Sequence, residues 1–290
     1  STWRELHAFS DLIQIQNPRE GYIRETNQPA ATMWAPNSPF PAGKYPDYIA
    51  NETPELVDQF SPVSRGVRAA EVLSGAYAWS DAEALELAFD EILPVTGAWQ
   101  DALRGALAAQ VDAMRPLEAP ARRVAQDVLH FDGRAHRDSH PALVFAYWMD
   151  AVAALRKRTT STSWPALGPR IRARATLEPA EQALLVQALS DAARRLTKEF
   201  GARKARYGEV FRFGRAAATV PIGGCSTPYD ATLRNFSCAQ QQSGSERRVV
   251  AGQKHMMLTI FAAPLRSYSL LAFGQNWRTT RATEHSNDQS

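Results

Sequence analysis

The periodicity of the apolar residues changes twice along this chain of 290 residues, first near Ser64 and again near Tyr207. Before Ser64 the sequence is rich in Pro, Asn and Gly and has short extended stretches, which favours strands joined by long loops. Between the two changes, apolar residues recur with the 3.6-residue period of amphipathic helices. After Tyr207, short runs of β-branched and aromatic residues alternate with Gly, Pro and Ser, which predicts strands. The sequence therefore predicts an α+β fold.

These changes divide the chain into three portions. We predict an N-terminal β and loop portion at residues 1–63, a helical insertion at 64–206 and a C-terminal β portion at 207–290. Open strand edges promote aggregation, and chain connections avoid crossing one another. We therefore expect the two β portions to share one sheet, with the helical block as an excursion from it.

Several element ends are marked by capping residues and breakers. Ser80-Asp81-Ala82-Glu83 has the pattern of a capping box at a helix start. A later helix is expected to begin at Pro179 and to end at Gly201, because Pro suits the first turn of a helix and Gly its end. The remaining predicted helices lie at residues 99–114, 119–129 and 141–155, and the predicted strands lie at 210–213, 248–251, 256–261 and 268–273.

Composition and charge exclude several classes of protein. With 44% apolar residues, the chain can bury a core of its own. Its longest apolar run, residues 142–155, is interrupted by Trp148-Met149-Asp150 and is shorter than a membrane-spanning helix, so we expect no span. A net charge of +3 is too small to indicate nucleic-acid binding. Basic clusters such as Arg156-Lys157-Arg158 lack interleaved aromatic residues, so they are interpreted as solvated faces rather than as a nucleic-acid or membrane surface.

The metal-ligating residue types do not form a recognisable site. Of six histidines, only His136 and His140 stand four residues apart, and no third ligand lies near them in the sequence. The two cysteines, Cys225 and Cys238, are thirteen residues apart, which fits no zinc motif. We therefore expect no metal site in this chain.

The segment from Asn17 to Asn27 is the first candidate for a functional site. Asn17-Pro18-Arg19-Glu20-Gly21 predicts a tight turn, and Tyr22-Ile23 predicts extended chain after it. Asn27 follows in a loop. Its amide donates hydrogen bonds without titrating, which suits the stabilisation of an oxyanion in acyl transfer. On residue type alone, a role in capping the turn is the alternative.

The same segment resembles the NPxxGY(I/V)xNxN element of the penicillin acylase family, a branch of the N-terminal-nucleophile hydrolases. Four further stretches resemble motifs of that family in the family's order along nearly the whole chain. They are Tyr45-Pro46 with Tyr48, Ser64 to Leu73, Asp132-Gly133-Arg134 with Asp138-Ser139 and 142–145, and the final set of Pro221 to Gly224, Gly274-Gln275, His285 and Asp288-Gln289. The chain departs from the family's pattern at Glu25, Asn276 and Thr283-Glu284.

The resemblance implies a fold and an activity. The fold is part of an αββα N-terminal-nucleophile hydrolase, with this chain as the C-terminal part of the β chain. The activity is hydrolysis of a linear amide between an acyl group and an amine, as in an N-acyl-homoserine lactone, a penicillin or a lipopeptide. The end segments are most similar to those of acyl-homoserine-lactone and aculeacin A acylases. A role in quorum quenching or antibiotic chemistry is expected from that similarity.

The resemblance also implies the identity of the nucleophile. In the family it is an N-terminal Ser whose α-amino group acts as general base, which is chemically reasonable because such an amine titrates near pH 8. Ser1 stands only a short way before the NPxxGY-like element, whereas the family's nucleophile lies far upstream of it, so Ser1 is not expected to be catalytic. We expect the nucleophile in an upstream β portion that, with an α chain, comes from one self-processing zymogen and forms a heterodimer.

Two residues of this chain match the family's catalytic machinery. Asn27 corresponds to the oxyanion-hole Asn, and Arg65 corresponds to an Arg that positions the site without reacting. An Arg on the helix surface, or one paired with Glu71 or Asp58, is the alternative interpretation of Arg65. Arg68, one helical turn later, is the alternative if the register differs by three residues.

Other consequences of the resemblance are structural. Members of the family are generally exported, so a periplasmic or secreted location is expected, and there Cys225 and Cys238 can form a disulfide; two free thiols are the alternative. His285 and Asp288-Gln289 are assigned a structural role. The activity is not expected to require a cofactor. The resemblance allows for a structural calcium ion, but we assign no ligands to it. The alternative for the whole chain is a non-catalytic binding or assembly module that keeps the acylase fold.

Overall fold

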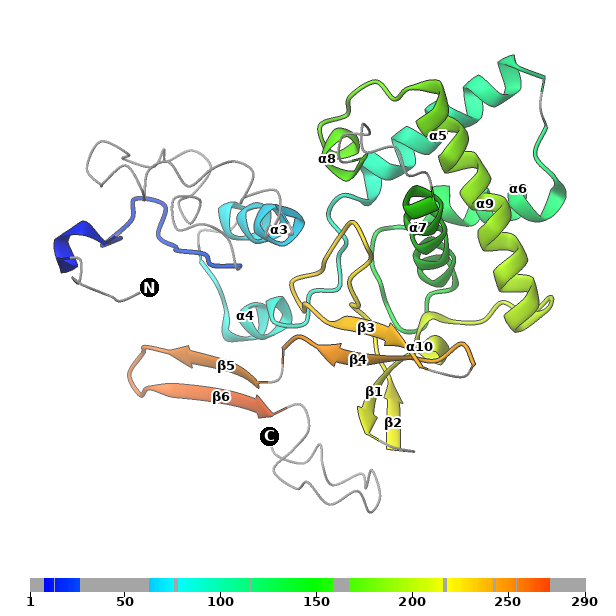
Figure 1. Ribbon diagram of the computed structural model, residues 1–290. Coiled ribbons are helices and arrows are strands. Elements are labelled where there is room, and N and C mark those ends of the chain that lie inside the picture. The colour runs from blue at the N-terminus through cyan, green and yellow to red at the C-terminus, as the bar shows by residue number, and fades with distance from the viewer. Residues whose placement is uncertain are drawn as a thin grey trace, which may run out of the picture. The chain divides into compact units, whose positions relative to one another are not determined.

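A computed structural model of the chain describes residues 8–12, 14–26, 63–75, 78–114, 116–158, 167–215, 218–241, 244–253 and 255–271. Within them the fold is α+β (Figure 1). The chain divides into two compact units, Ser1–Trp79 and Ser80–Ser290, which are described in turn.

The first unit contains a 3-10 turn and one helix among its described residues. The turn is η1 (Phe9–Asp11) and the helix is α3 (Val63–Ser74). Tyr22-Ile23, predicted as extended, and the two residues after them have no regular hydrogen-bonded structure, and no described strand of this unit pairs with them. The expected sheet with the C-terminal portion therefore stays a prediction.

The second unit contains the helices that the sequence predicts and two short ones that it does not. Its helices are α4 (Asp81–Leu87), α5 (Thr96–Asp112), α6 (Ala119–His130), α7 (His140–Arg158), α8 (Leu167–Arg172), α9 (Pro179–Phe200) and α10 (Tyr207–Val210). The capping box at Ser80 and Glu83 forms as predicted, with Ser80 N bonded to Glu83 Oε2 at 2.8 Å. At the end of α9, Gly201 adopts φ 63° and its N–H bonds to Thr197 O. The missed helices, α8 and α10, are too short for their periodicity to stand out.

α7 is the central helix of this core, because its own side chains are apolar on all sides of the helix. Its residues from Ala142 to Met149 are all buried, and α9 packs against α5, α6 and α7 (Figure 1). Trp148 of α7 contacts Trp99 of α5 edge to face at 6.0 Å and donates from Nε1 to Leu185 O at 3.1 Å. The buried amide of Gln100 donates to the carbonyls of Val128 and Phe131 and so satisfies acceptors at the end of α6.

The strands of the second unit form two separate sheets. The first has the order β2-β1-β4-β3, from β1 (Phe211–Arg215), β2 (Ala218–Pro221), β3 (Ser237–Gln240) and β4 (Arg247–Ala251). The β1–β4 pair is parallel, and the β1–β2 and β3–β4 pairs are antiparallel. Val210 belongs to α10 rather than to the predicted strand at 210–213, and β2 and β3 were not predicted. Side chains of this sheet join the same core as the helices.

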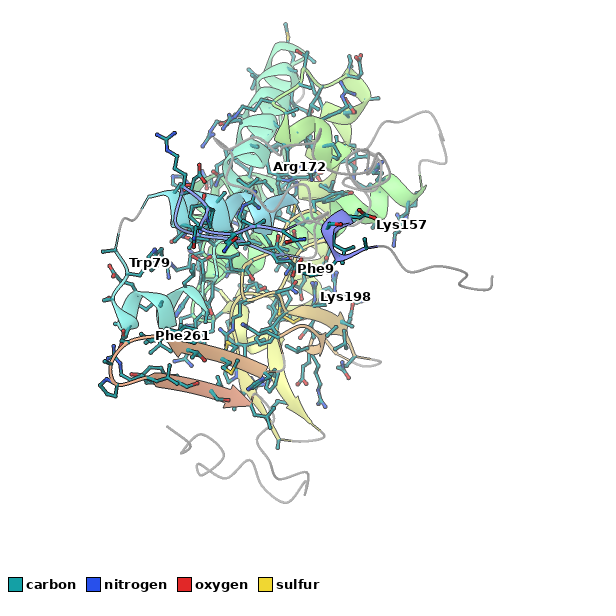
Figure 2. All side chains as sticks on the ribbon, turned by 90° about the vertical axis from the view of Figure 1, so that its left-hand side faces the viewer. Phe9, Trp79, Lys157, Arg172, Lys198 and Phe261 are labelled. Carbon is teal, nitrogen blue, oxygen red and sulfur yellow. A yellow bond between two sulfur atoms is a disulfide. The ribbon has the colours of Figure 1, made fainter. Side chains whose placement is uncertain are left out.

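The second sheet is the hairpin β5 (His255–Ile260) and β6 (Arg266–Leu271), close to the predicted ranges. On one face Leu258 lies opposite Tyr268, and Arg266 on that face forms an ion pair with Asp81 of α4, which packs on β5. Every residue of β6 is exposed, and Phe261 after β5 is 90% exposed (Figure 2). A two-stranded hairpin is marginally stable alone. Within the described residues of this unit, packing of α4 on β5 stabilises the hairpin.

Candidate active site

The candidate site begins at the turn that the sequence predicts. Gly21 N donates to Pro18 O at 2.9 Å, which closes a turn over Arg19 and Glu20. Asn17 and Gly21 adopt φ values of 47° and 78°, in the left-handed region that Asn and Gly tolerate. The turn sets the direction of the chain that runs from Tyr22 towards Asn27.

The segment after the turn lies along α3. Tyr22, Arg24 and Thr26 are more buried than Ile23 and Glu25, the alternation expected of extended chain with one covered face. Of the covered residues, Tyr22 contacts the end of the helix and Thr26 contacts its start.

Two hydrogen bonds fasten this segment to α3 in antiparallel direction. Tyr22 Oη lies 2.7 Å from Ser74 Oγ at the end of the helix, and Arg65 Nη2 donates to Thr26 O at 2.7 Å near its start. Nine residues of helix span about 13–14 Å at about 1.5 Å each. Four residues of extended chain span about 13 Å at about 3.3 Å each. The two lengths match, so both bonds form without distortion of either element.

Arg65 is buried, with 8% of its surface exposed. Burial lowers the pKa of its guanidinium from the ordinary value, and the nearby Glu25 carboxylate opposes that shift. Arginine keeps its charge in proteins, so the guanidinium acts here as a fixed cation and donor. Its hydrogen bond holds the carbonyl of Thr26, the residue directly before Asn27.

Arg68 occupies a different environment. Its guanidinium pairs with Glu71 at 3.3 Å within α3, and the Glu71 side chain is 63% exposed. The pairing with Glu71 that the sequence offered as an alternative for Arg65 is thus made by Arg68. The assignment of the positioning role to Arg65 rather than to Arg68 stays a prediction.

Several sequence-based assignments fall on residues outside the described ranges. These include the expected oxyanion donor Asn27, the residue Ser1 that was not expected to be the nucleophile, and the segments containing Tyr45, Tyr48, Gly274, His285 and Asp288. Their assigned roles stay predictions.

Two other family-like motifs meet in the second unit. Residues 91–93 lie beside 133–135: Leu93 N donates to Gly133 O at 2.8 Å, and Ala135 N donates to Glu91 O at 2.9 Å. The Pro221 to Gly224 segment joins them through Gly224 N, which donates to Ala135 O at 2.9 Å. We call this meeting point the motif junction.

An ion pair between the buried Glu91 and the partly buried Arg234 lies within the motif junction. Glu91 Oε1 accepts from Arg234 Nη1 at 2.7 Å, and desolvation raises the pKa of the Glu91 carboxyl although Arg234 opposes the shift. A Cβ on Gly223 would lie 2.4 Å from Glu91 Oε1 and 2.5 Å from Ala135 O. Close packing therefore requires glycine at position 223, which explains the first glycine of the Pro221 to Gly224 motif.

The histidines act in local structure. His140 Nδ1 lies 2.7 Å from Ala205 O, and Nε2 lies 3.5 Å from Asp127 Oδ2. Because a carbonyl only accepts, Nδ1 carries a proton. His136 lies 3.8 Å from Asp138. Among the described residues there is no group of three or more His, Cys, Asp or Glu side chains that could hold a metal ion.

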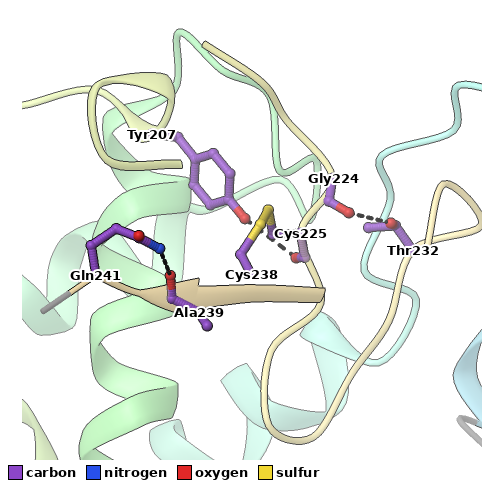
Figure 3. Close-up of a disulfide and its surroundings, with 7 residues drawn as sticks. All are labelled: Tyr207, Gly224, Cys225, Thr232, Cys238, Ala239 and Gln241. Carbon is purple, nitrogen blue, oxygen red and sulfur yellow. Dashed lines mark hydrogen bonds between the residues drawn. A yellow bond between two sulfur atoms is a disulfide. The ribbon is translucent and has the colours of Figure 1, made fainter. Parts of the chain in front are cut away.

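Cys225 and Cys238 are joined in a disulfide, with a Cα–Cα distance of 5.9 Å (Figure 3). Cys238 lies in β3. Tyr207 Oη donates to Cys225 O at 3.3 Å, and Thr232 Oγ1 donates to Gly224 O at 2.7 Å (Figure 3). The disulfide thus closes a loop that also carries Arg234 to the motif junction.

Sequence reasoning missed three residues of these sites. Thr26 contributes through its carbonyl, which carries no side-chain signal. Ser74 and Glu91 are ordinary surface types whose partners are 52 and 143 residues away. Residue types at 22–26 do not indicate the covered face, because Ile23 is exposed while Arg24 and Thr26 are covered.

A family model described as penicillin amidase matches residues 1–290, the whole chain. The chain therefore belongs to the penicillin amidase family. Membership points to hydrolysis of amide bonds in small molecules. Within the described residues, no helix has the length and apolar character needed to cross a bilayer.

Proposed function

We propose that this chain is the C-terminal part of the β chain of an N-terminal-nucleophile acylase that releases an acyl group from an amine. The substrate classes that we propose are N-acyl-homoserine lactones, penicillins and lipopeptides. The observation that carries the proposal is the hydrogen bond from the buried Arg65 guanidinium to the Thr26 carbonyl, in a chain that belongs to the penicillin amidase family. The bond fixes the backbone directly before the proposed oxyanion donor.

The proposed reaction needs a nucleophile that these residues do not supply. An N-terminal Ser outside the 290 residues attacks the amide carbonyl while its own α-amine takes the hydroxyl proton. The Asn27 amide donates to the oxygen as it gains negative charge, and Arg65 holds the Thr26 carbonyl so that this donor is already in place. The proton passes to the departing amine, and water then hydrolyses the acyl ester.

The setting that we propose follows the same family membership. The chain would act in the periplasm or outside the cell, as one product of a self-processed zymogen, in a heterodimer with the α chain. The reaction requires no cofactor. The described residues offer no cluster of acidic or histidine ligands, so we assign no calcium site to them.

The test of the donor is Asn27→Ala in the complete enzyme. Loss of one oxyanion donor typically lowers kcat about 10²- to 10³-fold. We expect that decrease with little change in KM or in the thermal unfolding midpoint. If kcat stays within about threefold of the unmodified enzyme, Asn27 is not the oxyanion donor.

Arg65 is proposed as a positioning residue, so its test needs a matched control and a conservative variant. Arg65→Met should lower kcat more than it changes KM, because the donor is misplaced rather than the substrate lost. Arg65→Lys keeps the charge and one donor and should restore part of kcat. The control Arg68→Met removes an Arg from the same helix and should leave kcat unchanged. Equal effects of the two methionine variants would refute the assignment.

A further inference from the structure

A groove runs between α6 and α9 in the second unit. One cavity, of about 260 Å³, is also lined by residues of α7 and by residues 201–205. A second cavity, of about 500 Å³, continues along the same two helices. The two share Pro120, Ala193 and Thr197 in their linings, so they form one continuous depression. We call it the α6–α9 groove.

The floor of the groove is apolar. Val124 of α6 and Val144 of α7 are buried, and Leu196 and Phe200 of α9 pack against the same core. These side chains present hydrocarbon to whatever occupies the cavity. Burying an aliphatic chain against such a surface is favourable in proportion to the area removed from water.

The rim of the groove is cationic. The lining includes Arg123, Lys198 (Figure 2) and Lys204, and among the described residues none of these three has an acidic partner within 4.0 Å. Two further rim cations are neutralised, since Arg194 pairs with Asp191 and Arg203 pairs with Glu209. The acidic lining residues are Asp127, which contacts His140, and Glu118. Charge at the rim therefore favours an anion.

From this floor and this rim, we propose that the α6–α9 groove binds an aliphatic monocarboxylate of medium chain length. The carboxylate lies at Arg123 and Lys204, and the alkyl chain lies on Val124, Val144 and Leu196. An inorganic anion would leave the apolar floor uncovered, and a neutral chain would leave the cations without a partner. The site is a depression of limited volume, which disfavours a flat membrane surface as the occupant.

The residues that line the groove belong to the second unit of the chain, and the proposed catalytic residues Asn27 and Arg65 belong to the first. An aliphatic acid is also the class of product that the proposed reaction releases. The binding argument does not rest on that reaction, because its test measures affinity without turnover. Failure of either proposal therefore leaves the other standing.

The first experiment is titration calorimetry of the complete protein with sodium octanoate. We expect saturable binding, and about tenfold weaker binding of hexanoate because two methylenes fewer are buried. Acetate, which has the charge without the chain, and octylammonium, which reverses the charge, should not bind measurably. Raised salt should weaken octanoate binding because exposed charges are screened.

The second experiment locates the site. Arg123→Glu with Lys204→Glu reverses two exposed rim cations and should weaken octanoate binding at least tenfold. The matched control, Lys157→Glu with Arg158→Glu, makes the same change in net charge at the exposed end of α7 and should change affinity less than twofold (Figure 2). Circular dichroism checks that both variants are folded; if the Glu pair misfolds, Arg123→Gln with Lys204→Gln replaces it. No octanoate binding, equal affinity for acetate, or equal effects of rim and control variants would overturn the proposal.

Discussion

Each unit of the molecule has an arginine that bonds to a family-like motif or beside one, the buried Arg65 in the first unit and the partly buried Arg234 in the second, and the two have different direct partners. Arg65 donates to the neutral carbonyl of Thr26, and Arg234 donates to the carboxylate of Glu91. In the first unit the guanidinium orders backbone next to a proposed donor. In the second unit it neutralises a buried acid at a point where three chain segments meet. We therefore propose that the same residue type serves positioning in one unit and cohesion in the other.

The surroundings of the two arginines reinforce this difference. The segment from Tyr22 to Thr26 is held to α3 by two hydrogen bonds near its ends. The motif junction is held by backbone hydrogen bonds, the close approach of Gly223 to Glu91 and the disulfide of the loop that carries Arg234. Variants of the first region should therefore change turnover, and variants of the second should change stability.

The largest stability effect is expected from Glu91→Ala. It leaves the always-charged Arg234 in the motif junction without its carboxylate, and breaking a buried pair in this way costs about 3–5 kcal/mol. Urea unfolding of the complete protein measures the change. Arg65→Met should cost less, about 1.5–3 kcal/mol, the range for a hydrogen bond that involves a charged group. If the two variants destabilise equally, the contrast between cohesion and positioning is wrong.

Removal of the disulfide should rank second. Its cysteines are 13 residues apart, and closing a loop of about that size stabilises a fold by about 3 kcal/mol through the unfolded chain. Cys225→Ser with Cys238→Ser should lower the unfolding free energy by that amount and leave kcat at saturating substrate nearly unchanged. Reduction of the unmodified protein provides the chemical control, and a large loss of kcat without loss of stability would contradict the separation of the two regions.

Gly223→Ala tests the packing of the motif junction, with a smaller expected effect. The added methyl group meets Glu91 Oε1 and Ala135 O at 2.4 and 2.5 Å, and overpacking of this kind costs about 1–3 kcal/mol. Gly105→Ala in α5 is the matched control, because nothing lies within 4 Å of the position that its methyl group would take and alanine favours helix by about 0.5–1 kcal/mol. The two substitutions should shift the thermal midpoint in opposite directions.

The sequence predicted the elements of this fold better than the contacts between them. Capping residues and periodicity located α4, α5, α6, α7 and α9 within a few residues, because those signals are local. β2 and β3 have only four residues each, and their strand character depends on neighbours in the sheet. The sharing of one sheet by the two β portions stays a prediction.

For the candidate site, the sequence indicated Arg65 through its motif but contained no indication of its partner. A backbone carbonyl such as that of Thr26 has the same chemistry at every position, so only the folded chain identifies which one accepts. The pairing of Glu91 with Arg234 could not be predicted either, because 143 residues separate them and only the folded chain brings them together. Residue types indicated chemistry, and the tertiary structure determined which groups meet.

The smallest effect is expected from the titration of His140, at the first residue of α7. Its ring lies between the carbonyl of Ala205 and the carboxylate of Asp127, and the contact with Asp127 is the main reason that the pKa of His140 is raised, against desolvation and the charge of Lys204. The other charged side chains lining the same cavity are cations: Arg123 and Arg203.

A raised pKa in the folded protein means that the folded state binds the proton of His140 more tightly than the unfolded state does. Its stabilisation is therefore fully present below the unfolded pKa of about 6.5 and is lost as pH rises through the higher folded value. We expect the unfolding free energy to fall over that window, and His140→Gln to flatten the fall. His130→Gln, at an exposed histidine that contacts the Gln126 carbonyl, is the matched control and should leave the slope in place. An unchanged slope in His140→Gln would show that the contact with Asp127 contributes nothing to stability.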